Sequence, residues 1–144
     1  MGHVQIFNKL YNVNDDTIMN INGTITFFYY KDLARATMFY DEVLGFERVI
    51  DIELAKVFRV HEGSHVGLVD GNVGYLKYME SKPVMLSWFS DDIEGWHKHL
   101  KEKGVEIEQQ PEKQSYLEMK TMLFRDTEGY LLEILQWLKK PYGS

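Results

Sequence analysis

The sequence predicts an α+β fold built from two tandem βαβββ modules. One strand, one helix and three further strands are expected in the same order twice, over 24–70 and over 84–137. A ferredoxin-like domain would place only two strands between its helices, whereas this sequence places three. Four residues of the first half also match four of the second at a constant offset of 66: Phe58, Arg59, Glu62 and Gly63 against Phe124, Arg125, Glu128 and Gly129.

The first module begins with a run of β-branched and aromatic residues over 24–30, which is typical of a strand. Asp32 is a good helix N-cap, and Gly45 stands where a helix that ends needs a left-handed residue. Apolar residues recur every three or four positions between them, so a helix is predicted over 33–44. Three short strands are then predicted at 46–52, 55–60 and 64–70, followed by a connector over 71–83.

The second module repeats this order. A strand is predicted over 84–90, Asp91 and Asp92 supply the N-cap of a second helix, and Gly104 ends it. Strands follow at 105–109, 117–124 and 130–137, with Pro111 expected in a loop. Residues 1–23 are expected to form an added N-terminal arm and 138–144 a frayed tail.

Composition excludes several classes of function. A chain of 144 residues has the size of one domain, and its net charge of −6 gives no general attraction to nucleic acid or to an anionic membrane. The absence of cysteine removes disulfides, thiolate nucleophiles and cysteine-based zinc sites. No apolar run is long enough for a secretory signal or a membrane span, so a cytoplasmic protein without a membrane partner is expected.

The repeat, with KDLARATMFYDEVLGF at 31–46 and FRDTEGYLLEILQW at 124–137, resembles the vicinal oxygen chelate superfamily of glyoxalases, extradiol dioxygenases and bleomycin resistance proteins. The resemblance implies that each module curls its strands into half a cup, with helices outside and a ligand inside. It also implies a homodimer, since proteins of this kind often complete or cover their cups with a second chain.

Enzymes of that superfamily hold a divalent metal with side chains from the first and last strand of each module. The resemblance places these positions at Ile25, Gly67, Met85 and Glu133. Only Glu133 can bind a hard cation, and one carboxylate cannot hold zinc, iron or manganese. No cofactor is therefore expected. The alternative is one divalent ion bound by Glu133 and His65 with a third group.

Two histidines require separate consideration. Residues 61–65, HEGSH, match the zinc motif H-E-x-x-H, but that motif needs a helix and Gly63 suggests a turn between strands. With a two-residue turn, Val60 would oppose His65. His65 shares a strand face with Gly67, so a general acid–base pair with Glu133 is one hypothesis. The alternative is a hydrogen-bonded His and a Glu that serves only as a ligand contact or a structural remnant.

Strand alternation is expected to send a set of side chains to the inner face of the cup. Rings on a concave sheet suit a flat, aromatic or cationic ligand, and the alternative is ordinary core packing. Gly67 is expected to leave room for that ligand. The predicted ligand-binding residues are Phe27, Tyr29, Phe58, His65, Met85, Ser87, Phe89, Phe124 and Glu133.

Three functions remain open from the sequence. The first is a metal-free protein that binds or sequesters a small aromatic or cationic organic molecule. The second is a lyase, isomerase or dioxygenase with a non-standard site on His65 and Glu133. The third is a ligand-sensing or interaction module. Nucleotide cofactors are not expected, because no glycine-rich phosphate-binding motif occurs.

Overall fold

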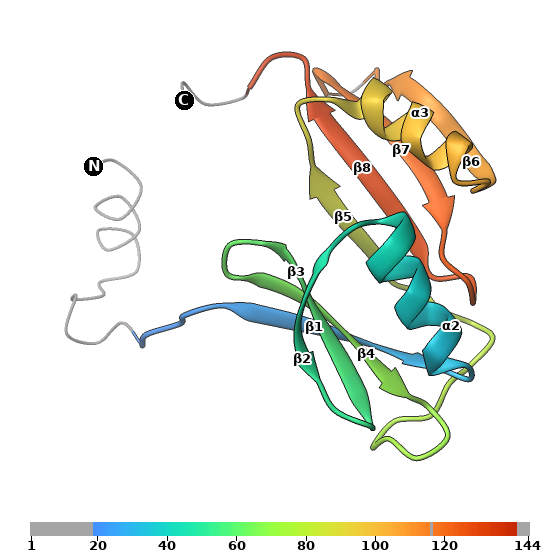
Figure 1. Cartoon of the computed structure of the whole chain (residues 1–144). Helices are drawn as coiled ribbons and strands as arrows, with labels where there is room; N and C mark the ends of the chain where they lie inside the picture. Colours follow the sequence, from blue (N-terminus) through green and yellow to red (C-terminus); the bar gives the residue numbers. More distant parts are fainter. Residues whose placement is uncertain (1–18, 116, 141–144) are drawn as a thin grey trace.

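We describe residues 19–115 and 117–140 in a computed structural model of the chain. It contains two four-stranded sheets, ordered β1-β4-β3-β2 and β5-β8-β7-β6, each with one parallel pair at β1–β4 or β5–β8 (Figure 1). The predicted α+β fold of two curled βαβββ modules is confirmed. The first module comprises β1 (Thr24–Tyr30), α2 (Leu33–Met38), η2 (Phe39–Val43), β2 (Glu47–Asp51), β3 (Ala55–His61) and β4 (Ser64–Asp70). The second comprises β5 (Met85–Phe89), α3 (Ile93–Glu102), β6 (Ile107–Lys113), β7 (Met119–Arg125) and β8 (Leu131–Trp137).

Both helices begin at the predicted aspartates. The Asp32 carboxylate accepts from the backbone N–H of Arg35 at 3.1 Å, and Asp92 makes the equivalent bond to Gly95 at 3.0 Å. The first helix is not α-helical throughout, because its second half, η2, is a π-helix. Gly45 and Gly104 follow the helices with φ of 71° and 79°, as expected of residues that end a helix.

Two details of the strands differ from expectation. Pro111 lies within β6 rather than in a loop. It is tolerated because β6 is an edge strand and its register to β7 shifts between Gln109 and Glu112. In the β3–β4 hairpin the register shifts between Arg59 and His61, so His65 pairs with Arg59 and not with Val60.

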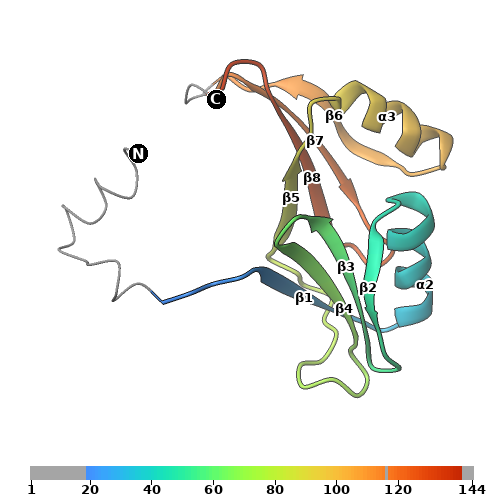
Figure 2. The same ribbon diagram turned by 60° about the vertical axis from the view of Figure 1, so that its left-hand side comes forward.

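The two modules share one hydrophobic core. Both helices lie on the same side of the strands and cover one face of each sheet (Figure 2). Aromatic contacts cross from one module to the other beneath them: Phe28 stacks on Tyr130 with ring centroids 4.1 Å apart, and Phe46 meets Trp88 edge-to-face at 5.3 Å. None of the helices in the described part of the chain covers the opposite face of either sheet (Figure 2).

Of the ends of the chain, the structure describes only short stretches. Residues 19–23 have no regular secondary structure, and the remainder of the expected arm, 1–18, lies outside the described residues, as do 141–144 of the tail. Within the described part of the chain, neither helix is long and apolar enough to cross a membrane.

Candidate functional site

We call the surface of the two sheets that none of the described helices covers the cup face, and several large apolar side chains are exposed on it. In β1, Phe28 and Tyr30 are buried beneath the helices, so alternation sends Ile25, Phe27 and Tyr29 to the other face. In β5 the same alternation gives Met85, Ser87 and Phe89. Phe27 and Met85 are each 46% exposed and Phe89 is 60% exposed. The cup face is thus an open surface that exposes large apolar side chains.

Phe58 and Phe124 do not belong to the cup face, and their prediction as ligand-binding residues was wrong. Phe58 pairs with Val66, and Phe124 pairs with Leu132. All four side chains are fully buried in the core under the helices. In the first module the reason is the irregularity at Val60, which moves Phe58 one position from Gly67 along β4 and so onto the opposite face.

In the first half of the cup face, the side chain of Phe27 fills the space beside Gly67. Phe27 lies directly opposite Gly67 in the β1–β4 pair. A Cβ atom at position 67 would stand 2.4 Å from Cδ1 and 2.5 Å from Cε1 of Phe27, so this ring covers the glycine. Gly67 therefore makes room for Phe27 and not, as expected, for a ligand. Any larger side chain at position 67 would have to displace the ring.

The second half of the cup face carries the carboxylate of Glu133. Ser87 lies opposite Glu133 in the β5–β8 pair, and its Oγ donates a hydrogen bond to Glu133 Oε1 at 2.7 Å. The rings of Phe89 and Trp137 stack nearby, with centroids 5.6 Å apart and planes 12° from parallel. Trp137 was missed in the sequence, although it shares the strand parity of Glu133.

The side chains of the cup face do not fit the metal of the superfamily's enzymes. Ile25 and Met85 have no oxygen or nitrogen donor, and Gly67 lies under a phenyl ring. Within residues 19–115 and 117–140, no three His, Asp or Glu side chains gather in a way that could hold a metal ion. Glu133 is left without the companions that a hard divalent cation requires.

The two histidines of the HEGSH motif lie on separate strands, His61 in β3 and His65 in β4, and not on one helix. Nδ1 of His65 lies 3.1 Å from the carbonyl oxygen of Thr24, so we assign the ring proton to that nitrogen. His65 belongs to the first sheet and Glu133 to the second, and none of the hydrogen bonds among the described residues joins them. Their action as an acid–base pair stays a prediction.

A buried polar cluster joins the two modules away from the cup face. Asp126, 8% exposed, accepts hydrogen bonds from the hydroxyls of Tyr30 at 2.5 Å and Tyr40 at 2.9 Å. Its other oxygen accepts from the backbone N–H groups of Glu128 and Tyr130, each at 3.0 Å. Burial raises the pKa of the Asp126 carboxyl above its usual value, although these hydrogen bonds act in the opposite direction. Burial also raises the pKa of both tyrosines.

The 126–130 turn, which follows β7, docks onto the first module at two further points. The Glu128 carboxylate accepts from the backbone N–H groups of Lys31 and Asp32, both at 2.8 Å. The Tyr130 hydroxyl accepts from Tyr29 N–H at 2.9 Å and donates to the Tyr29 carbonyl at 3.0 Å. We therefore interpret Asp126, the first residue of this turn, as a structural residue.

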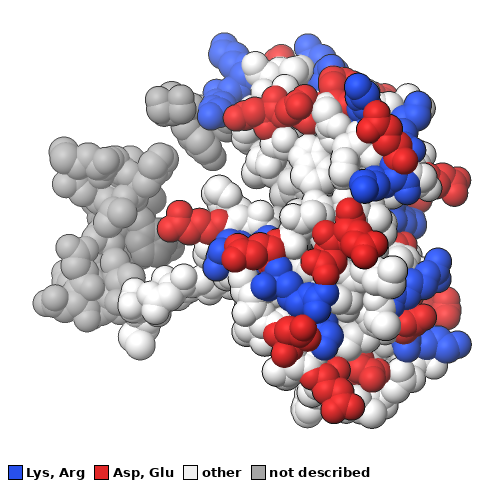
Figure 3. All heavy atoms as spheres, in the orientation of Figure 1, with Lys and Arg blue, Asp and Glu red and all other residues white. Residues whose placement is uncertain are grey.

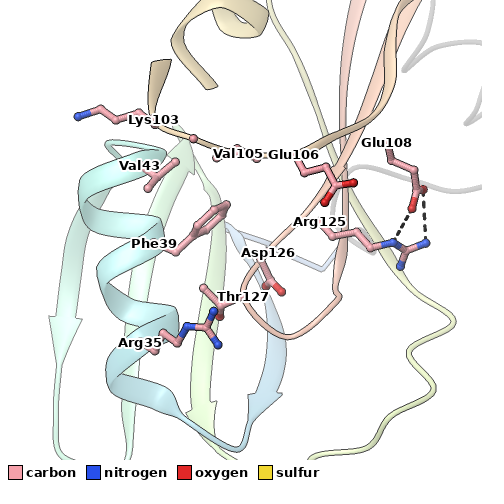
Figure 4. Close-up of a pocket in the computed structure, with 11 residues that line it drawn as sticks. Arg35, Phe39, Val43, Lys103, Val105, Glu106, Glu108, Arg125, Asp126 and Thr127 are labelled. Carbon is pink, nitrogen blue, oxygen red and sulfur yellow. Dashed lines mark hydrogen bonds and ion pairs between the residues drawn. The ribbon is translucent and has the colours of Figure 1, made fainter. Parts of the chain in front are cut away.

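The helical side of the molecule has a cleft of about 510 Å³ between α2, the segment after α3 and the 126–130 turn (Figure 4). Its lining carries charges of both signs, from Arg35, Lys103 and Arg125 and from Glu106, Glu108 and Asp126. Arg125 is turned toward Glu108, with Nε to Oε1 at 2.8 Å. Acidic and basic side chains are also interspersed over the face shown in Figure 3, so that face has no large basic patch for a nucleic acid.

Comparisons with known proteins agree with this architecture. The family model described as "Glyoxalase/Bleomycin resistance protein/Dioxygenase superfamily" matches residues 23–134. A search of curated proteins finds no match. Among solved structures, a glyoxalase/bleomycin resistance protein/dioxygenase from Nocardioides is 18% identical, with 99% of each chain covered and a TM-score of 0.70.

Two further solved structures have the same fold. Lactoylglutathione lyase from Agrobacterium tumefaciens is 18% identical over 83% of this chain and 96% of its own, with a TM-score of 0.67. TioX from Micromonospora sp. ML1 is 19% identical over 79% of this chain and 97% of its own, with a TM-score of 0.64. At these identities the likeness extends to the fold alone.

Proposed function

Because this chain belongs to the glyoxalase/bleomycin resistance protein/dioxygenase superfamily, we propose that it binds a small aromatic or cationic organic molecule on its cup face without a metal ion. The observation that carries the proposal is the pairing of Ser87 with Glu133 beside the exposed apolar side chains of Met85 and Phe89. One oxygen of Glu133 accepts the serine hydroxyl. A carboxylate has further lone pairs, so it can still accept a hydrogen bond from a ligand cation.

The rings of the cup face supply the second part of this argument. The stacked pair of Phe89 and Trp137 and the half-exposed ring of Phe27 are flat apolar surfaces. Aromatic rings attract other rings and organic cations by stacking and cation–π contact, each worth about 0.5–2 kcal/mol. A flat cation is the ligand that uses both the rings and the carboxylate.

Sequestration is better supported than catalysis. The enzymatic alternative, a lyase, isomerase or dioxygenase, needs His65 and Glu133 to act together, whereas His65 bonds to the Thr24 carbonyl and Glu133 to Ser87. The metal route needs ligands that positions 25, 67 and 85 do not supply. We place the protein in the cytoplasm as part of the same proposal.

We further propose a homodimer that covers part of the cup face. Ile25, Phe27, Met85 and Phe89 are each more than 40% exposed, and exposed apolar patches are often buried by a second copy. Sedimentation of the full chain is expected to give a dimer. A monomer at micromolar concentration would contradict this part of the proposal.

The proposal is tested by calorimetric titration of the full chain with benzylammonium, with benzyl alcohol and benzoate as uncharged and anionic controls. We expect benzylammonium to bind most tightly of the three compounds. Glu133→Gln should weaken benzylammonium binding about ten-fold and leave the weaker binding of benzyl alcohol unchanged. Equal binding of benzylammonium and benzoate would overturn the proposal. So would stoichiometric zinc, manganese, nickel or iron in protein purified without chelators.

A further inference from the structure

The two modules repeat each other, but only one of their turns is docked. In the second module the ring of Tyr130, at the end of the 126–130 turn, stacks on Phe28 at 4.1 Å with planes 8° from parallel. Its hydroxyl bonds to both the N–H and the carbonyl of Tyr29. One tyrosine thus covers an aromatic side chain of β1 and satisfies two backbone groups at the edge of that strand.

The equivalent position in the first module lacks this ring. At the repeat offset of 66, Ser64 corresponds to Tyr130. The turns themselves match, since Gly63 and Gly129, which precede these residues, have φ of 75° and 89°. At the offset of 60 for the first strands, Trp88 corresponds to Phe28 and Phe89 to Tyr29. Serine is too short to reach across to β5.

A cleft of about 440 Å³ lies where the missing ring would be expected. We call it the Trp88 cleft. It lies between the β3–β4 hairpin and β5, and its lining includes Val60, His61, Ser64, Trp88, Phe89 and Ser90. A volume of this size is within the range of small-molecule sites.

Among the described residues, Trp88 has an unpaired polar group and no stacked aromatic neighbour. The residue is only 9% exposed, and its indole Nε1 has no hydrogen-bond partner among the described residues. Its ring contacts with Phe46, Trp96 and Phe124 are all edge-to-face. A buried N–H without a partner is uncommon in proteins and calls for a bound group or water.

The backbone of β5 has an open edge beside this cleft. β5 is an edge strand of its sheet: β8 pairs with one of its edges, and the other edge is unpaired in the sheet (Figure 1). The N–H of Ser90 donates to the carbonyl of Leu135 in β8 at 2.9 Å. Because successive residues of a strand point their backbone groups to opposite sides, the N–H and carbonyl of Phe89 point away from β8. They correspond to the two groups of Tyr29 that bind the Tyr130 hydroxyl.

We infer that the Trp88 cleft is a binding site for a phenol. The ring of the ligand stacks on Trp88 as Tyr130 stacks on Phe28, and its hydroxyl accepts from the N–H of Phe89 and donates to the carbonyl of that residue. Ser87 and Phe89 of the proposed cation site also border the cleft, whereas Glu133 does not line it, so the two sites adjoin and Glu133 distinguishes them.

The site is tested by NMR titration of the isotope-labelled full chain with p-cresol. We expect saturable shifts of the Ser64 and Phe89 amide signals, with a dissociation constant on the order of 1 mM for a fragment of this size. Toluene, which lacks the hydroxyl, should bind about ten-fold more weakly. Equal binding of toluene, or shifts confined to the cup face around Phe27 and Glu133, would overturn the inference.

Substitutions supply the matched controls. Ser64→Tyr should fill the cleft with its own ring, abolish the p-cresol shifts and raise the melting temperature, whereas Ser64→Ala should retain binding. Full p-cresol binding by a folded Ser64→Tyr protein would contradict the inference. If that variant does not fold, the comparison of p-cresol with toluene on the unmodified chain still tests the inference. Glu133→Gln should leave p-cresol binding unchanged, which separates this site from the proposed function.

A phenol can come from a free molecule or from a tyrosine side chain. N-acetyltyrosinamide distinguishes these sources within the same experiment. Shifts of Ser64 and Phe89 with both compounds would assign the cleft to tyrosyl groups as well as to free phenols, and shifts with p-cresol alone would assign it to small phenols.

Discussion

Replacing Asp126 with alanine is expected to be among the most damaging single changes outside the hydrophobic core. Four donors bind this carboxylate: two tyrosine hydroxyls and two backbone N–H groups. In the variant Tyr30 and Tyr40 can still bond to each other, since their hydroxyl oxygens lie 3.2 Å apart. One hydroxyl thus keeps a partner, and three donors lose theirs.

The size of the effect follows from this count. Each buried donor without a partner costs about 1–3 kcal/mol, and the loss is reduced because the variant no longer buries a carboxylate. We expect Asp126→Ala to lower the free energy of unfolding by about 3–4 kcal/mol. Asp126→Asn is the matched control. Its amide oxygen can still accept the two backbone bonds and its nitrogen can donate to the tyrosine oxygens, so its loss should be about 1 kcal/mol.

Urea denaturation at neutral pH measures both variants. With an m-value of about 2 kcal/mol/M, the midpoint of Asp126→Ala should fall by about 1.5–2 M and that of Asp126→Asn by about 0.5 M. A loss below about 1 kcal/mol for alanine would refute the assignment of Asp126 as the joint between the modules. Equal losses for the two variants would show that the charge, and not the hydrogen-bond geometry, is what the fold uses.

Three other predictions concern the same parts of the molecule. Because the folded pKa of Asp126 is raised, its protonated form stabilises the fold below the unfolded value of 3.8, and this contribution disappears as pH rises through the folded pKa. Stability measured from pH 4 to 8 should therefore fall more steeply for the wild type than for Asp126→Asn. Tyr130→Phe should lower the unfolding free energy by about 1–2 kcal/mol in urea titrations, since both backbone groups of Tyr29 lose their partner. Gly67→Ala should displace the Phe27 ring and destabilise the protein, and Phe27→Ala in the same chain should remove most of that loss, as a double-mutant cycle would show.

The secondary structure could be predicted because local signals determine it. Asp32 and Asp92 cap their helices, and the repeated order of elements limits the topology to one arrangement of modules. The π-helical second half of the first helix had no such signal in its residues. Its apolar spacing fits an α-helix equally well over so short a stretch.

The cup face could be predicted only in part, because it depends on strand register. A single irregularity at Val60 shifts by one residue all the β3–β4 pairs from Arg59 back to Ala55. This shift places Phe58 in the core. No local pattern in HEGSH distinguishes a two-residue turn with a bulge from one without it. The Asp126 cluster could not be predicted from the sequence either, because Tyr30, Tyr40 and Asp126 meet only when the modules pack together.

The ring of Phe27 over Gly67 restricts how this cup can change in evolution. A carboxylate introduced at position 67 would have to displace the ring of Phe27, which is 46% exposed. Replacing Phe27 with a smaller residue would leave more room for a side chain at position 67. The two positions are therefore coupled, because a substitution at either one changes the space available at the other.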